Sequence, residues 1–163
     1  MAKNTPFELD TIDLQLLDLL QTDAAQSNQA LAERVHVSPP TCLRRVKRLH
    51  SAGLIERQVA LLQPDCVAAL VGHGLQSIVE ITLERQGAEW LDAFEARAVP
   101  EAAVQQCWRV SPGPDFVLIT HTRDMPAYLA LAQRLFTSDA NVRNVRAFFS
   151  TRRAKFDTRV ALT

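Results

Sequence analysis

The segment SPPTCLRRVKRLHS, residues 38–51, carries a cluster of basic side chains and no acidic one, although the formal net charge of the whole chain is zero. The basic residues are Arg44, Arg45, Lys47 and Arg48. A small, apolar stripe at helical spacing is formed by Cys42, Val46 and Leu49. Ser38 suits an N-cap, Pro39 a first helical position and Gly53 a helix end. The charges lie opposite the stripe, so this helix has either a solvated basic face or a surface for DNA phosphates and base edges.

The residues before this helix favour DNA binding. Residues 10–21 have the apolar spacing of a helix, and Ser27 and Asn28 can cap a second, short helix, NQALAERV. A tight turn at residues 36–38 leads into the basic helix. A short helix, a turn and a longer basic helix are typical of a helix-turn-helix, whose second helix enters the major groove. Residues 54–62, LIERQVALL, alternate loosely and predict a β-strand or wing.

The composition argues against several other classes of protein. The 163 residues are 47% hydrophobic, enough for packed cores in one domain or two small ones. No apolar window is long enough to span a membrane and no signal-peptide core follows the N-terminus, so we expect a cytoplasmic protein. Three widely spaced cysteines indicate neither a disulfide scaffold nor a zinc site. Because the four histidines are dispersed and catalytic motifs are absent, we predict no enzyme activity, metal or cofactor.

The second half of the chain has a different pattern. Alternation and helical spacing predict, in order, a strand at 75–83, a helix at 87–99, strands at 104–110 and 115–120, a helix at 125–136 and an extended segment from 141. This βαββαβ order is the ferredoxin-like arrangement. Its helices cover one face of the sheet, and the other face is commonly buried against a second copy, so a homodimer is expected.

Two stretches of the first half resemble the Lrp/AsnC (feast/famine) family of transcriptional regulators. The matching patterns are Leu9-Asp10-x-x-Asp13-x-x-Leu16-Leu17-x-x-Leu20-Gln21-x-Asp23 and Leu31-Ala32-x-x-Val35-x-Val37-Ser38-x-x-x-Cys42-x-x-Arg45-Val46-x-x-Leu49-x-x-x-Gly53-x-Ile55. The chain departs from the family at Ala25, where an Arg is usual, and at His36, where a Gly is common. The first departure affects a phosphate or intramolecular contact.

The resemblance implies an α+β protein: a winged helix-turn-helix followed by a ferredoxin-like βαββαβ domain for effector binding and assembly. The predicted division is a DNA-binding domain at 1–62, a linker at 63–74 and an effector and oligomerisation domain at 75–163. Family members dimerise through the second domain and often form tetramers or octamers, with small effectors, typically amino acids, bound between dimers. We therefore expect double-stranded DNA, a homo-oligomer and an amino-acid effector as partners.

The hairpin turn of the second domain is the predicted effector site. Val110-Ser111-Pro112-Gly113-Pro114-Asp115-Phe116 resembles the family pattern Val-(Thr/Ser)-Gly-x-(Tyr/Phe)-Asp-(Tyr/Phe), with a proline in place of the glycine. The predicted effector-binding residues are Ser111, Gly113 and Asp115. Two prolines remove N–H donors that a carboxylate needs, and residues 147–149 are apolar, so a weakly bound apolar amino acid such as leucine or methionine is favoured. Asp115 as a simple turn cap, and loss of effector binding, remain alternatives.

The sequence thus predicts a sequence-specific DNA-binding transcriptional regulator that responds to an amino acid. Its predicted DNA-binding residues are Ser38, Pro39, Pro40, Thr41, Arg44, Arg45, Lys47 and Arg48, of which the three arginines should supply most of the affinity. Two alternatives remain open. One is a nucleoid-like architectural DNA-binding protein without an effector, and the other is a partnered regulator of a biosynthetic pathway of the haem type.

Overall fold

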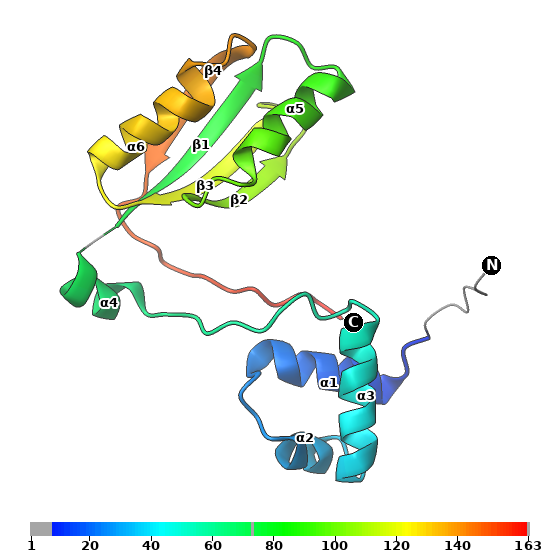
Figure 1. Cartoon of the computed structure of the whole chain (residues 1–163). Helices are drawn as coiled ribbons and strands as arrows, with labels where there is room; N and C mark the ends of the chain where they lie inside the picture. Colours follow the sequence, from blue (N-terminus) through cyan, green and yellow to red (C-terminus); the bar gives the residue numbers. More distant parts are fainter. Residues whose placement is uncertain (1–7, 73, 163) are drawn as a thin grey trace. The chain divides into compact units, whose positions relative to one another are not determined.

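The computed structural model describes residues 8–72 and 74–162 (Figure 1). The chain divides into two compact units, one made of its first 61 residues together with the segment from Lys155 onward, and one of residues 62–154. The C-terminal segment, predicted as the end of the ferredoxin-like domain, therefore belongs with the N-terminal helices. His73 and the outer limits of the predicted domains, residues 1 and 163, lie outside the described residues.

Three helices form the N-terminal unit: α1 (Thr11–Thr22), α2 (Asn28–Arg34) and α3 (Pro39–Ser51). Their starts follow from the capping residues. The Asp10 side chain accepts a hydrogen bond from the Asp13 N–H, and the Asp13 side chain accepts one in return from the Asp10 N–H, which is a capping box. Ser27 caps α2 by accepting from the Ala30 N–H. The predicted helix-turn-helix is thus confirmed.

The turn between α2 and α3 contains a left-handed residue. His36 has φ of 55°, a conformation that glycine adopts more easily, which accounts for the glycine usual at this position in the family that the sequence resembles. Ser38 occupies the N-cap position of α3, but its side chain makes no cap hydrogen bond. Its hydroxyl pairs instead with that of Thr41 at 2.9 Å. Because Pro39 and Pro40 have no N–H, the start of α3 has fewer donors that need a cap.

The predicted strand or wing at 54–62 does not form. Residues 55–63 form neither helix nor strand and join no sheet within the described chain. A strand requires a neighbour for its backbone groups. Val59, Leu61 and Leu62 are accordingly exposed. The predicted linker instead contains a helix, α4 (Pro64–Val71), which begins at a proline and ends at Gly72, whose φ is 86°.

The second unit is a four-stranded antiparallel sheet in the order β2-β3-β1-β4 with two helices on one face (Figure 1). Its elements are β1 (Leu75–Leu83), α5 (Ala88–Ala98), β2 (Val104–Arg109), β3 (Phe116–Thr122), α6 (Met125–Ala132), which continues as a π-helical turn (Gln133–Thr137), and β4 (Val142–Phe149). Asp124 caps α6 by accepting from the Ala127 N–H. The βαββαβ order and the α+β class are confirmed.

The two faces of this sheet differ in burial. Alternate residues of β1, from Ser77 to Leu83, are buried under the helices with alternate residues of β3. The opposite face carries exposed apolar side chains on three strands, namely Ile78, Trp108 and Phe148. Between them lies one ion pair, Glu80 to Arg146 at 3.3 Å. The predicted uncovered sheet face is therefore present, and it carries apolar side chains beside charged and polar ones.

Candidate DNA-binding surface and ligand loop

Helix α3 has one buried and one exposed side. Cys42 and Leu49 are fully buried in the core of the N-terminal unit, where burial raises the pKa of the Cys42 thiol. This confirms Cys42 as a small core residue. Arg44 and Lys47 are exposed on the other side, together with Leu43. Because the exposed side carries basic groups and the buried side anchors the helix, α3 has the arrangement that insertion into a major groove requires.

The arginines of α3 do not all share one environment. Arg45 Nη1 donates to Asp10 Oδ2 at 2.7 Å and to Asp13 Oδ1 at 2.9 Å. Arg48 Nη2 is paired with the other oxygen of Asp13. Asp13 itself is fully buried, whereas the Arg45 side chain is 18% exposed and that of Arg48 42% exposed. The predicted DNA-binding arginines thus divide into exposed Arg44 and two that bind a carboxylate of α1.

This ion-pair cluster fixes α3 to α1. A buried carboxylate needs both its oxygens satisfied, and Asp13 achieves this through the two arginines and the Asp10 N–H. The pKa of Asp10 lies below its usual value, chiefly because its carboxylate accepts from the Asp13 N–H and also from Arg45. A lowered carboxyl pKa contributes stability above the ordinary pKa and loses it as the pH falls. Acid should therefore loosen the start of α1.

The start of α3 is held by a second contact. Asn28, at the beginning of α2, donates from Nδ2 to the Pro39 carbonyl at 2.8 Å. With the hydroxyl pair of Ser38 and Thr41, this contact sets the N-terminal turn of α3 relative to α2. The predicted DNA-facing residues Ser38, Pro39, Pro40 and Thr41 therefore lie on one well-anchored turn next to Arg44.

Sequence reasoning assigned no role to Asp13 or Asn28. A signal for Asp13 was available, since it lies at helical spacing among Ile12, Leu16 and Leu20, on the buried side of α1. An acidic residue on an apolar face implies a cationic partner, although the sequence does not say which one. Asn28 was read as a possible cap, and no local signal connects its amide with Pro39.

The predicted effector residues lie on the turn between β2 and β3. Val110 N–H donates to the Asp115 carbonyl at 3.0 Å, and the turn contains a cis peptide bond before Pro112. Ser111 and Gly113 are exposed, and Gly113 has φ of 123°, a conformation that other residues rarely adopt. The structure thus brings Ser111 and Gly113 together on an accessible loop.

Asp115 is engaged with the neighbouring strand. Its Oδ2 accepts from the Leu83 N–H at 2.6 Å and from Gln86 Nε2 at 3.3 Å, and its own N–H donates to the Ile81 carbonyl at 2.8 Å. These contacts join the turn to the end of β1. Asp115 therefore ties the turn to the end of β1 through its side chain, and any ligand would have to share this carboxylate with the Leu83 N–H.

The described residues give no support for a metal site, a membrane-spanning helix or a disulfide bond. Within 8–72 and 74–162, no group of three or more histidine, cysteine and acidic side chains is placed to hold a metal ion. In the same part of the chain, no helix is long and apolar enough to cross a membrane. Cys42, Cys66 and Cys107 are all free thiols.

Comparison with known domains matches both units. Residues 9–50 match an AsnC-type helix-turn-helix domain, and residues 76–160 match the Lrp/AsnC ligand binding domain. The first match covers α1, α2 and α3 with their Asp13 cluster. The second covers the sheet except for Leu75 at the start of β1, includes the turn around Asp115, and extends into the C-terminal segment.

Whole-chain comparisons agree with the domain matches. The leucine-responsive regulatory protein of Rhizobium meliloti is 36% identical, covering 91% of this chain and 92% of its own. The DNA-binding transcriptional activator DecR of Escherichia coli is 33% identical, covering 92% and 96%. The crystal structure of a transcriptional regulator from Neisseria meningitidis in complex with L-Met has a TM-score of 0.81 at 29% identity, covering 95% and 97%. This chain belongs to the Lrp/AsnC family of DNA-binding transcriptional regulators and is not an enzyme.

Proposed function

We propose that this regulator acts in the cytoplasm and reads specific DNA sequences through the first turns of α3. The observation that carries the proposal is the anchored first turn of α3, followed on the same helix by the exposed basic residues Arg44 and Lys47. In a helix-turn-helix the start of the second helix faces base edges, and later basic residues meet phosphates. The proposed contact residues are Ser38, Pro39, Pro40, Thr41, Arg44, Arg45, Lys47 and Arg48. Within this set we assign base reading to Arg44, and to Arg45 mainly the positioning of α3.

Replacing Arg44 and Arg45 separately distinguishes these roles. Arg44→Ala should weaken specific DNA binding by about 1–3 kcal/mol, the contribution of a base-reading arginine, and leave the thermal stability unchanged. Arg45→Ala should lower the thermal stability as well, because it removes the Asp10 and Asp13 ion pairs. Fluorescence anisotropy with a selected duplex and differential scanning calorimetry measure the two effects. Unchanged binding by Arg44→Ala would exclude the proposed orientation of α3.

We propose further that an apolar amino acid is the effector, bound at the turn that carries Ser111, Gly113 and Asp115. The Neisseria relative crystallised with L-Met and the leucine-responsive relative support this class of ligand. Phe149 and Tyr128 pack edge to face, with their ring centroids 5.0 Å apart, but Phe149 pairs with Ser77 at the end of β1 away from the turn, so these rings do not line the proposed site. An exposed glycine N–H suits a carboxylate, and Asp115 suits an ammonium group. The prolines of the turn reduce its donors, so weak binding is expected.

A thermal-shift screen of the twenty amino acids tests this effector. A ligand present at one hundred times its Kd should stabilise the protein by about 2.7 kcal/mol. Asp115→Asn should abolish the shift at little cost to the unliganded protein, because an amide oxygen still accepts from the Leu83 N–H. Asp115→Ala should lose both the shift and this hydrogen bond, lowering stability by about 1–3 kcal/mol. If no amino acid shifts the wild-type protein at millimolar concentration, the architectural alternative without an effector replaces this proposal.

We propose that the protein is a homodimer joined through the uncovered sheet face, with assembly to tetramers or octamers as a further step. The apolar side chains Ile78, Trp108 and Phe148 support this, because exposed apolar patches of this kind mark interaction sites. Ile78→Glu should convert the dimer to a monomer, since a carboxylate in the centre of an apolar interface would be buried without a partner. Val99→Glu, an exposed valine at the end of α5, is the control. Light scattering of the full chain measures the oligomeric state of each variant. An Ile78→Glu variant that is still dimeric would contradict this interface.

A further inference from the structure

The C-terminal strap, residues 157–162, is largely exposed and is hydrogen-bonded to α1 in the N-terminal unit. The Gln21 side chain donates from Nε2 to the Val160 carbonyl at 3.0 Å, and the Val160 N–H donates to Gln21 Oε1 at 2.9 Å. A side-chain amide thereby pairs with a backbone amide as two strands would pair. The contact satisfies both polar groups of Val160 and leaves its side chain exposed.

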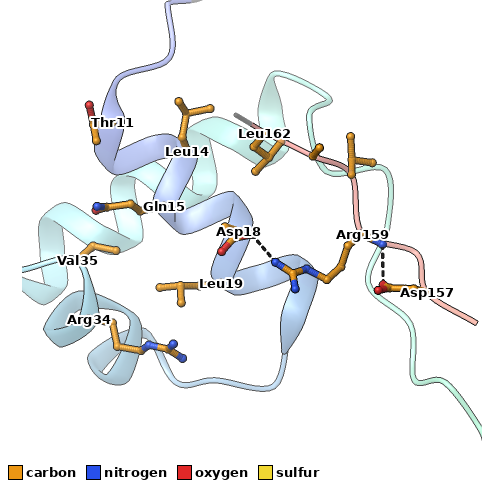
Figure 2. A pocket seen from close by; sticks show the side chains of 12 residues that line it. Thr11, Leu14, Gln15, Asp18, Leu19, Arg34, Val35, Asp157, Arg159 and Leu162 are labelled. Atoms are coloured by element: carbon orange, nitrogen blue, oxygen red, sulfur yellow. Dashed lines mark hydrogen bonds and ion pairs between the residues drawn. The ribbon is translucent and has the colours of Figure 1, made fainter.

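A second contact lies one turn earlier on α1. Arg159 Nη2 donates to Asp18 Oδ1 at 3.0 Å, and the Arg159 N–H donates to Asp157 Oδ1 at 3.0 Å, which shapes the strap as it reaches the helix (Figure 2). The pKa of Asp18 lies below its usual value, first because of the Gln21 side chain and then because of Arg159. Two charged or polar side chains of α1 therefore bind the strap.

These contacts use a side of α1 that the helix-turn-helix core leaves available. Leu14, Asp18 and Gln21 recur at helical spacing, whereas Asp13, Leu16 and Leu20 are buried toward α3. Leu14 and Leu162 also line an open cavity of about 890 Å³, which α1 and the strap share with the end of α2 (Figure 2). The strap thus has its own binding surface, the outer stripe of α1, formed by Leu14, Asp18 and Gln21.

We propose that the outer stripe of α1 is a docking site for the C-terminal strap, and that the strap preorganises the helix-turn-helix for DNA. The N-terminal unit continues into the ligand-binding unit through residues 52–63. Residues 150–156 lead from the end of β4 back to the strap. Docking therefore attaches the DNA-binding helices at two points. A second attachment restricts the orientations of these helices. Less conformational entropy is then lost when the two α3 helices of a dimer bind DNA.

Protection from trypsin tests the docking in the intact protein. Cleavage after Arg159 requires the strap to leave α1, so its rate follows the undocked fraction. Gln21→Ala removes both hydrogen bonds to Val160. It should raise this rate at least about fivefold, since one hydrogen bond of about 1 kcal/mol already corresponds to that factor. Gln29→Ala is the matched control, because this α2 glutamine donates to Glu33 on its own helix. Equal cleavage of Gln21→Ala and the wild type would overturn the docking site.

DNA affinity tests the consequence. Val160→Pro removes the N–H that donates to Gln21 without changing α1, and Val160→Ala keeps this backbone group. The proline variant should bind a specific duplex at least about fivefold more weakly than the alanine variant, because it lacks one hydrogen bond to Gln21. The thermal stability of the helix-turn-helix should be the same in both variants. Equal DNA affinity of the two variants would overturn the preorganising role of the strap, even if the trypsin result shows docking.

Discussion

Asp13→Ala should lower the free energy of unfolding of the helix-turn-helix unit by about 3–5 kcal/mol, the cost of removing one partner from a buried ion pair. The Arg45 guanidinium would keep only Asp10, and Arg48 would lose its buried carboxylate. The capping box at the start of α1 would also lose its second hydrogen bond. Because small domains are stabilised by only about 5–15 kcal/mol, DNA binding should fall with the folded fraction.

Calorimetry of the full chain measures this effect, and Asp10→Ala is its control. Asp10 forms the same cluster, but its side chain is 52% exposed. Its replacement should cost about 0.5–2 kcal/mol, the usual effect of removing an N-cap. If Asp13→Ala costs no more than Asp10→Ala, the cluster does not hold α3 against α1.

Phe116→Ala should destabilise the ligand-binding unit by about 3–5 kcal/mol, the usual cost of truncating a buried phenylalanine. The Phe116 ring is fully buried, with its centroid 4.7 Å from that of Phe94 on α5. Phe116 directly follows Asp115, so loosening of β3 should also remove any thermal shift caused by an amino acid. The effect should appear in the calorimetric transition of residues 62–154.

Leu129→Ala is the matched control for Phe116→Ala. Leu129 lies on α6 of the same unit and is 60% exposed, so its truncation should change stability by at most about 0.5 kcal/mol. A similar small loss for Phe116→Ala would contradict the assignment of this residue to the core between the sheet and α5.

The parts of the fold that rest on local signals were predictable. Capping residues and apolar spacing located α1, α2 and α3, and alternation located the strands of the sheet. The features that depend on distant partners were not predictable. The sequence marks Arg45 as basic, but its pairing with Asp13 comes from the crossing of two helices that local patterns do not specify. The sequence predicts one DNA-binding role for all three arginines, whereas in the structure Arg44 is exposed and Arg45 and Arg48 pair with Asp13.

The segments outside the two cores were the least predictable. Residues 54–62 alternate like a strand, but alternation alone provides no partner for the backbone. The linker predicted at 63–74 contains Pro64, and a proline suits the first turn of a helix, here α4. The last extended segment was predicted as one piece, whereas β4 ends at Phe149 and the strap joins the other unit. Its pairing with Gln21 leaves no pattern in the sequence, because a single side-chain amide makes it.

Selection of binding sites from random duplexes by the full chain tests most directly the claim that α3 reads specific DNA. At an ionic strength of about 0.15 M, where exposed charges are substantially screened, the wild type should enrich a pseudo-palindrome. Its half-sites should lie about 10 bp apart or a multiple of that distance. Arg44→Ala should lose the preference at one position of each half-site. Binding of all duplexes with equal affinity, weakened by salt to the same degree, would contradict a sequence-reading role for α3.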